Sequence, residues 1–535
     1  TEKQSCEVGM SFWSFPYPSQ RMPVLADNVV ATSQPLAAQA GLHMLRQGGN
    51  AVDAALAAAI ALTVVEPTSN GLGSDLFAMV WDGNTLHGIN GSGRSPWSWD
   101  YTRFADCQCM PAVGWDAVTV PGAVRAWRDL SERFGQLPFA DLFEPAIRYA
   151  RDGFLVSPII AGQWDAVSQP HAHRPEFAAS FMPCGQAPKA GERFVNPDQA
   201  RSLLLLAESH GQSLYTGELA ERMVRQAREQ GGALELGDLS GHESAWVDPI
   251  GYHVQDWLVH EMPPNGQGLA ALMALGILDI LEVGQYPVDS VQAVHYQVEA
   301  MKVAFAQVHA HVADPQAMTW SVDRFLDPGL LQSLARSIKP DQAAMPAVRL
   351  PCNGGTVYLS AADAQGRMVS LIQSNYMGFG SGVVIKGTGI SLQNRGAGFA
   401  LDPGHPNCVA GGKRPYHTII PGFVTGQGRP LLSFGVMGAH MQPQGHVQVL
   451  QRMKLWGQNA QTVLDAPRWQ VSPDFRLALE PVLAKHIGPD LAGLGHELIP
   501  DPPEFIFGGG QIVQCLDAGY AAASDPRKDG QAVGF

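Results

Sequence analysis

The hydrophobic pattern of this chain changes its period near Thr356, and this change constrains the fold more than any other feature of the sequence. From about residue 35 to residue 350 the pattern is mostly helical; residues 291–308, for example, carry apolar side chains at steps of three and four. From Thr356 onward the period is two, and residues 356–362 and 368–374 predict a β-hairpin with a glycine-containing turn. The sequence therefore predicts an α+β protein in which helices pack outside sheets.

Glycine and asparagine mark the best-defined helix boundary. Gly48-Gly49-Asn50 separates two Ala- and Leu-rich segments, residues 35–47 and 51–64. We expect a glycine to end the first helix and an asparagine cap to begin the second. Further elements are expected later in the chain: strands at 382–385, 418–423 and 430–435, and a helix at about 445–456.

The charge balance and the cysteine usage limit the classes of function. The formal net charge is −14, so a polyanionic partner is disfavoured and we expect no nucleic-acid binding. The 7 cysteines are odd in number and scattered through 535 residues, which argues against a disulfide framework. Two His-x-His pairs stand isolated, and no metal site is expected. The longest apolar run, residues 54–65, is too short to span a membrane, and no signal peptide is evident, so we expect a cytoplasmic protein without membrane contact.

Several motifs occur in a fixed order over most of the chain. The motifs are residues 48–55 (Gly-Gly-Asn-Ala-Val-Asp-Ala-Ala), 70–75 (Asn-Gly-Leu-Gly-Ser-Asp), 120–122, 299–305, 356–402, 412–415 and 435–439. Each alone is weak, but with this order and spacing the chain resembles the gamma-glutamyltransferase family at nearly full length. The resemblance implies a four-layer αββα sandwich of the N-terminal-nucleophile hydrolase type. It also implies a precursor cut between Gly355 and Thr356 into an α chain (1–355) and a β chain (356–535) that intertwine as one fold, and it leaves open a dimer of αβ units.

The implied catalytic group is Thr356, made the first residue of the β chain by the cut. A threonine hydroxyl needs a base, and the α-amino group of a terminal threonine, with an ordinary pKa of about 7.7–8.0, supplies one. By the resemblance, Ser374 bonds the nucleophile, and the backbone N–H groups of Gly438 and Ala439 form the oxyanion hole. No cofactor is implied. A plain β-strand role for Thr356 or Ser374 is the alternative.

The departures from the family pattern concern the substrate. The family's Gln and Asp that hold a substrate amine fall on Arg395 and Gly398, its Asn beside the nucleophile on Tyr376, and its paired serines on His417 and Thr418. Arg395 would repel an ammonium and attract a carboxylate. A structural salt bridge for Arg395 and a packing role for His417 remain alternatives.

A second arginine stands near the family's carboxylate-binding position. That position falls on Ser92, whereas Arg94 lies two residues before Pro96, a pattern similar to the acylase-like branch of the family. Arg94 is a candidate for substrate binding or for support of its loop. Together these residues predict a small amide that bears a carboxylate and no amino group, with oxamate as first choice and glutaryl amides as in cephalosporin acylases as an alternative. A gamma-glutamyl transferase or hydrolase, and an uncleaved binding or scaffold protein, are the rival predictions.

Overall fold

Two seven-stranded antiparallel sheets form the centre of the molecule. The computed structural model describes residues 13, 15, 19–346 and 354–535. The first sheet, here the β15 sheet, has the order β1 (Val24–Ala26), β19 (Tyr520–Ser524), β18 (Gly509–Cys515), β15 (Arg429–Met437), β14 (Gly422–Gly426), β9 (Trp257–Glu261) and β8 (Ile250–Val254). The second, here the β10 sheet, has the order β20 (Gln531–Gly534), β2 (Val29–Thr32), β10 (Gly355–Ala362), β11 (Met368–Tyr376), β3 (Asp75–Trp81), β4 (Leu86–Gly91) and β7 (Ala245–Val247).

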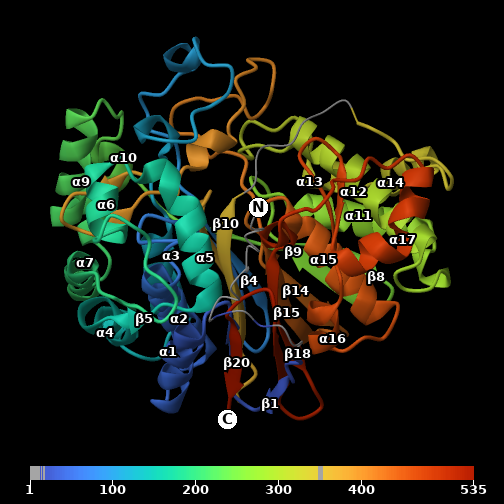
Figure 1. Cartoon of the computed structure of the whole chain (residues 1–535), viewed down its shortest axis with the longest axis horizontal. Helices are drawn as coiled ribbons and strands as arrows, with labels where there is room; N and C mark the ends of the chain where they lie inside the picture. The colour runs from blue at the N-terminus through green and yellow to red at the C-terminus, as the bar shows by residue number, and fades with distance from the viewer. Residues whose placement is uncertain (1–12, 14, 16–18, 347–353) are drawn as a thin grey trace, which may run out of the picture.

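Helices cover the outer face of each sheet, as Figure 1 shows with the two sheets between a left and a right helical layer. The layer over the β10 sheet contains α1 (Pro35–Arg46), α2 (Ala51–Val65), α3 (Ala123–Phe134), α4 (Glu144–Asp152), α5 (Pro158–Ser168), α6 (Pro175–Phe181), α7 (Pro197–Glu208), α8 (Ser213–Thr216), α9 (Glu218–Glu229) and α10 (Leu236–Ser240). The layer over the β15 sheet contains α11 (Gly268–Ile280), α12 (Val291–His311), α13 (Val322–Phe325), α14 (Pro328–Ser337), α15 (Met441–Lys454), α16 (Ala460–Asp465) and α17 (Pro481–Gly493). Short two-stranded pairs, β5 (Phe154–Leu155) with β6 (Arg193–Phe194), β12 (Val384–Ile385) with β13 (Ile390–Ser391), and β16 (Trp469–Val471) with β17 (Leu477–Leu479), lie outside the two sheets.

The apolar pattern of the chain explains these layers. All residues of α2 are buried, which suits a helix with apolar side chains on every face between a sheet and other helices. Between the two sheets, side chains such as Phe77, Tyr358, Ile372 and Phe423 interdigitate in a separate apolar cluster. The predicted four-layer αββα arrangement is therefore confirmed.

Several element predictions are confirmed closely. Asn50 caps α2 with its side chain in a capping box with Asp53, and α12 begins at Val291 as expected. The hairpin of β10 and β11 and the strand at 430–435 are present. The helix expected at about 445–456 is α15, which begins earlier, at Met441.

Two other element predictions hold only in part. The strand expected at 418–423 begins only at Gly422, because residues 418–421 run irregularly through the site described below. The mostly helical region before residue 350 also contains strands, including β3 and β4, which pair beside β11. Every residue of β3 is buried, so its sequence lacks the alternation by which a half-exposed strand is recognised.

Each sheet contains strands from both sides of Thr356. β10 pairs with β2 on one side and β11 pairs with β3 on the other, so segments far apart in sequence share one hydrogen-bonded ladder. In the described part of the chain, no helix has the length and apolar character needed to cross a membrane.

Candidate active site

Thr356 lies at the start of β10, where its hydroxyl belongs to a defined hydrogen-bond chain. The residue is 1% exposed. Thr356 Oγ1 donates to Ser374 Oγ at 3.1 Å, and Ser374 Oγ donates to the carbonyl oxygen of Gly355 at 2.8 Å and accepts from the N–H of Tyr376 at 2.8 Å. A Cβ on Gly354 would collide with the carbonyl oxygen of Tyr376, so glycine is required at this approach. The hydroxyl of Thr356 and the carbonyl of the preceding peptide therefore meet at one serine.

A tight turn after β15 presents two backbone N–H groups beside this strand. Gly438 has φ 129° and Ala439 has φ 50°, and α15 begins at Met441. Within residues 19–346 and 354–535, neither N–H group donates to a protein acceptor. Positive φ is costly for alanine, so the turn is held by its surroundings.

The facing of the two sheets places this turn opposite Thr356. Ser360 bonds Ser433 at 2.8 Å, and two residues along each strand Tyr358 packs on Gly435. Because side chains on one face recur every two residues, the next step brings Thr356 opposite the end of β15, where the turn begins. Two N–H groups ahead of a helix N-terminus are suited to hold an oxyanion.

Arg395 is a fully buried cation that lies against Tyr376, the last residue of β11. Its side chain is 1% exposed, Nη1 donates to Thr418 Oγ1 at 2.8 Å, and the guanidinium carbon lies 4.6 Å from the centre of the Tyr376 ring. Nε and Nη2 have no acceptor among the described residues. Burial lowers the pKa of Arg395 to about 10, against the opposing effect of Asp75, so the group stays charged at neutral pH. Two N–H groups on one edge of a guanidinium match the two oxygens of a carboxylate.

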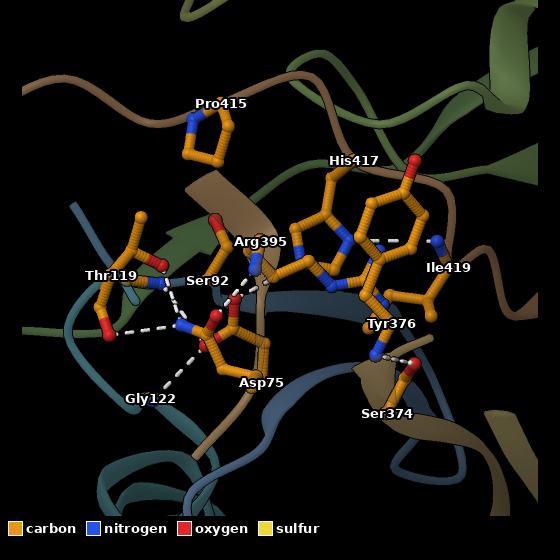
Figure 2. Close-up of polar contacts among 12 residues, drawn as sticks. Asp75, Ser92, Thr119, Gly122, Ser374, Tyr376, Arg395, Pro415, His417 and Ile419 are labelled. Carbon is orange, nitrogen blue, oxygen red and sulfur yellow. Dashed lines mark hydrogen bonds and ion pairs between the residues drawn. The ribbon is translucent and has the colours of Figure 1, made fainter. Parts of the chain in front are cut away.

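Asp75 and His417 form a buried pair near Arg395 (Figure 2). His417 Nε2 lies 3.1 Å from Asp75 Oδ2, and the N–H of Ile419 lies 3.4 Å from Nδ1, so we place the ring proton on Nε2. Burial raises the pKa of Asp75 to about 7, although Arg395 opposes that rise. Burial and the nearby arginines hold the pKa of His417 well below its usual value, so the ring is neutral.

The relatives of this chain decide its family. The gamma-glutamyltranspeptidase family profile matches residues 37–535. The chain belongs to the gamma-glutamyltranspeptidase family. The oxamate amidohydrolase proenzyme of Klebsiella pneumoniae subsp. pneumoniae is 37% identical over 520 residues, 94% of this chain and 97% of that protein. The glutathione hydrolase-like YwrD proenzyme of Bacillus subtilis is 35% identical over 518 residues, 95% of this chain and 98% of that protein.

A solved structure resembles the chain over nearly its full length. A cephalosporin acylase from Bacillus halodurans matches with a TM-score of 0.93 and 44% identity, over 99% of both chains. This member of the gamma-glutamyltranspeptidase family is thus an enzyme that hydrolyses amide bonds, with the four-layer fold of the N-terminal-nucleophile hydrolases.

The structure brings most of the predicted site residues together but holds Arg94 apart. Thr356, Ser374, Tyr376, Arg395 and Thr418 form one connected set of contacts. Arg94 instead donates from Nη1 to Asp314 at 3.2 Å and to the carbonyl oxygen of Gly412 at 2.9 Å. These contacts connect the loop of Arg94 with the segments that contain Asp314 and Gly412 in this gamma-glutamyltranspeptidase family member.

Two polar residues in this region were missed by sequence reasoning. Asp75 was noted only within the motif 70–75, although a lone acid at the start of the apolar strand β3 is a signal of a buried charge. Gln267 follows the loop that precedes α11, and its side chain donates to the carbonyl oxygens of Thr418 and Ala439. No local pattern reveals such a contact between distant segments.

Among the residues that the structure describes, one cluster away from this site has side chains of the metal-ligand type. His295, Glu299 and His496 place ligand atoms within 4.8 Å of one another. The Lys302 ammonium bonds Glu299 at 2.9 Å, and His295 bonds His496 at 2.8 Å. A metal ion would displace these bonds and meet the lysine charge, so the cluster fits a hydrogen-bonded core network that holds α12 to the segment after α17.

Proposed function

We propose that the chain is a precursor that cleaves itself between Gly355 and Thr356, giving an α chain of residues 1–355 and a β chain of residues 356–535. The support is the contact of Ser374 with both reacting groups, the hydroxyl of Thr356 and the carbonyl oxygen of Gly355. Relatives named as proenzymes agree with it. Thr356 Oγ attacks the carbonyl carbon of Gly355, its proton passes to Ser374, and Ser374 gives its own proton to the carbonyl oxygen. Collapse of this adduct breaks the C–N bond, returns the proton to the Thr356 nitrogen and leaves an ester that water hydrolyses.

In the mature enzyme the freed α-amino group of Thr356 takes the place of a separate base. The amine accepts the hydroxyl proton while Oγ attacks the amide carbon of the substrate. The N–H groups of Gly438 and Ala439 stabilise the negative oxygen, and the proton then goes to the leaving nitrogen. Water releases the acid from Thr356, so a primary amide yields ammonia.

The proposed substrate is a short amide that carries a carboxylate and no amino group, with oxamate as the first choice and oxalate and ammonia as products. The observation that carries this choice is the pair of N–H groups on buried Arg395 without a protein acceptor. A buried charge lacking such partners is costly, and a substrate carboxylate would satisfy both groups. Tyr376 and Thr418 hold the guanidinium in place.

Asp75 bears on the rival gamma-glutamyl substrate, because an acid near the site could bind an amine. Its carboxylate already accepts from the N–H groups of Gly93 and Gly122, at 3.3 and 3.1 Å, and contacts His417. These contacts occupy both oxygens, and we therefore favour a substrate without an amino group. A glutaryl-type acylase is the second candidate, favoured by the 44% identity to the cephalosporin acylase.

The test is intact mass and N-terminal sequencing of the purified protein, followed by ammonia release from oxamate, from glutaric monoamide and from glutamine. Two fragments, one of which begins at Thr356, and ammonia from oxamate are expected. Ammonia from glutamine alone would overturn the substrate assignment in favour of the gamma-glutamyl rival. A persistent full-length chain without activity would overturn the nucleophile assignment in favour of a binding protein.

Ser374→Ala tests the cleavage step separately. The rate of cleavage should fall by a factor on the order of 10²–10³, because the scissile carbonyl loses its proton donor. The variant should therefore accumulate as an uncleaved chain. Ser370→Ala is the matched control, since Ser370 lies on the same strand and bonds Tyr358 away from the junction. Cleavage of Ser374→Ala at the wild-type rate would contradict the relay.

A further inference from the structure

One glutamine side chain connects the oxyanion turn with the carboxylate-binding residues. Gln267 is fully buried. Its Nε2 donates to the carbonyl oxygen of Thr418 at 2.6 Å and to that of Ala439 at 2.8 Å. Its Oε1 accepts from the hydroxyl of Tyr416 at 3.2 Å. Both hydrogens of the amide nitrogen are used, so the orientation of the side-chain amide follows from the network.

The two partners of this amide belong to the two halves of substrate recognition. Thr418 accepts a hydrogen bond from Arg395, the residue proposed to bind the substrate carboxylate. Ala439 has a left-handed backbone with φ 50°, and its N–H is part of the proposed oxyanion hole. A hydrogen bond to the carbonyl oxygen of Ala439 restrains a peptide that an L-residue does not adopt by preference.

The backbone of Gln267 is held to the segment of His417 by contacts that do not involve its side chain. Its N–H donates to the carbonyl oxygen of His417 at 3.0 Å, and the neighbouring Gly266 forms a bridge with His417. A change of the side chain therefore leaves the loop attached, while it removes the two bonds of the amide nitrogen. This separation of backbone from side chain makes the residue open to experiment.

We propose that Gln267 is a positioning residue that sets the distance between the carboxylate-binding Arg395 and the oxyanion turn at Gly438 and Ala439, and thereby the acyl length that the enzyme accepts. The inference rests on the proposed function. In oxamate the carboxylate and the amide carbon are directly bonded, whereas in glutaric monoamide three methylene groups separate them. A rigid short substrate requires both binding groups at one fixed separation, but a flexible longer one can adapt.

The experiment compares kcat/KM for oxamate and for glutaric monoamide in Gln267→Met, which keeps the side-chain length without hydrogen bonds. We expect the oxamate value to fall on the order of 100-fold, and the glutaric monoamide value to change by less than about threefold. The ratio of the two values is the readout, because general loss of folded protein lowers both equally. Gln267→Glu, of almost equal volume, should shift the ratio in the same direction because it places an oxygen against two carbonyl oxygens.

Gln448→Met is the matched control. Gln448 is also a buried glutamine whose Nε2 donates to two backbone carbonyls, those of Gln444 and Trp469, at 3.2 and 3.0 Å. It touches neither Thr418 nor Ala439, so its ratio should equal that of the wild type. Equal losses for both substrates in Gln267→Met, or an unchanged ratio in both Gln267 variants, would overturn the inference alone. A wild-type protein that hydrolyses neither amide would overturn the proposed function and this inference with it.

Discussion

Replacing Arg395 with methionine should separate substrate binding from stability, because the two effects have opposite signs. Methionine fills similar space without a charge. Loss of one member of a buried, bidentate charge pair costs about 2–5 kcal/mol in binding, which corresponds to roughly 30- to 4,000-fold in affinity. We therefore expect the KM for oxamate to rise by at least about 30-fold, while Thr356 still cleaves its precursor.

The stability effect follows from the pKa of Arg395. Burial lowers this pKa from its ordinary value to about 10, so the folded state disfavours the charged side chain. At about 1.36 kcal/mol for each pKa unit, the charge costs on the order of 3 kcal/mol at neutral pH, after the favourable effects of Asp75 and Tyr376. Removing the charge should leave the free energy of unfolding unchanged or raise it by up to this amount. Asp75 reduces the gain, because its carboxylate loses a nearby cation.

The assay is steady-state ammonia release together with inhibition by oxalate, the expected product, and thermal unfolding at a fixed scan rate. Loss of oxalate inhibition with an unchanged or higher unfolding temperature is the expected outcome. An unchanged KM with a lowered unfolding temperature would refute the reasoning, since that combination describes a structural salt bridge. Arg395→Lys should recover little of the binding, because an ammonium cannot offer two parallel N–H groups.

Three further predictions follow from the described contacts. The pKa of Asp75 is raised to about 7, so the folded state favours the protonated acid. The contribution of this acid to stability is therefore present below pH about 4 and is lost as the pH rises through about 7. Denaturant unfolding at several pH values should show that Asp75→Asn gains stability relative to the wild type over that window, by an amount on the order of 4 kcal/mol. Equal pH profiles would contradict it. Arg94→Gln should leave the KM for oxamate within about threefold and lower the unfolding temperature modestly, because Arg94 bonds Asp314. Steady-state kinetics and thermal unfolding measure the two effects, and a large rise in KM would show that Arg94 binds substrate. Gly438→Ala should lower kcat on the order of 10²-fold with little change in KM. The reason is that φ is 129° at this position and the new Cβ would lie 3.2 Å from Cβ of Met441. An unchanged kcat would show that the turn does not form the oxyanion hole.

Sequence patterns predicted the parts of the fold that local physics determines. The cap at Asn50, the helix from Val291 and the β10–β11 hairpin each follow from spacing within a few residues. β3 escaped detection because burial on both faces erases alternation. The irregular path of residues 418–421 escaped because it depends on contacts with Arg395 and Gln267 from distant segments.

In the candidate site, too, sequence motifs predicted which residues take part, but not the contacts between distant segments. Thr356, Ser374 and the turn at Gly438 and Ala439 were predicted through motif order, and Arg395 through a departure from the family pattern. The environment of Arg395 was beyond the sequence, because the packing of Tyr376 on its face and the missing acceptors are properties of the folded state. The loop role of Arg94 likewise depends on Asp314, which lies far along the chain.

The single hydrogen of Ser374 links the two proposed reactions. A serine hydroxyl has one hydrogen to donate, and in this chain it goes to the carbonyl oxygen of Gly355 while Thr356 and the N–H of Tyr376 donate to the serine oxygen. Cleavage frees the Gly355 carbonyl, so Ser374 loses its acceptor when Thr356 gains its α-amino group. The same hydroxyl can then turn its hydrogen to the Thr356 oxygen, whose proton the new amine takes. In the proposed mechanism, self-cleavage thus removes one acceptor and supplies one base, which is sufficient to change the site from an intramolecular to an intermolecular reaction without moving the strands.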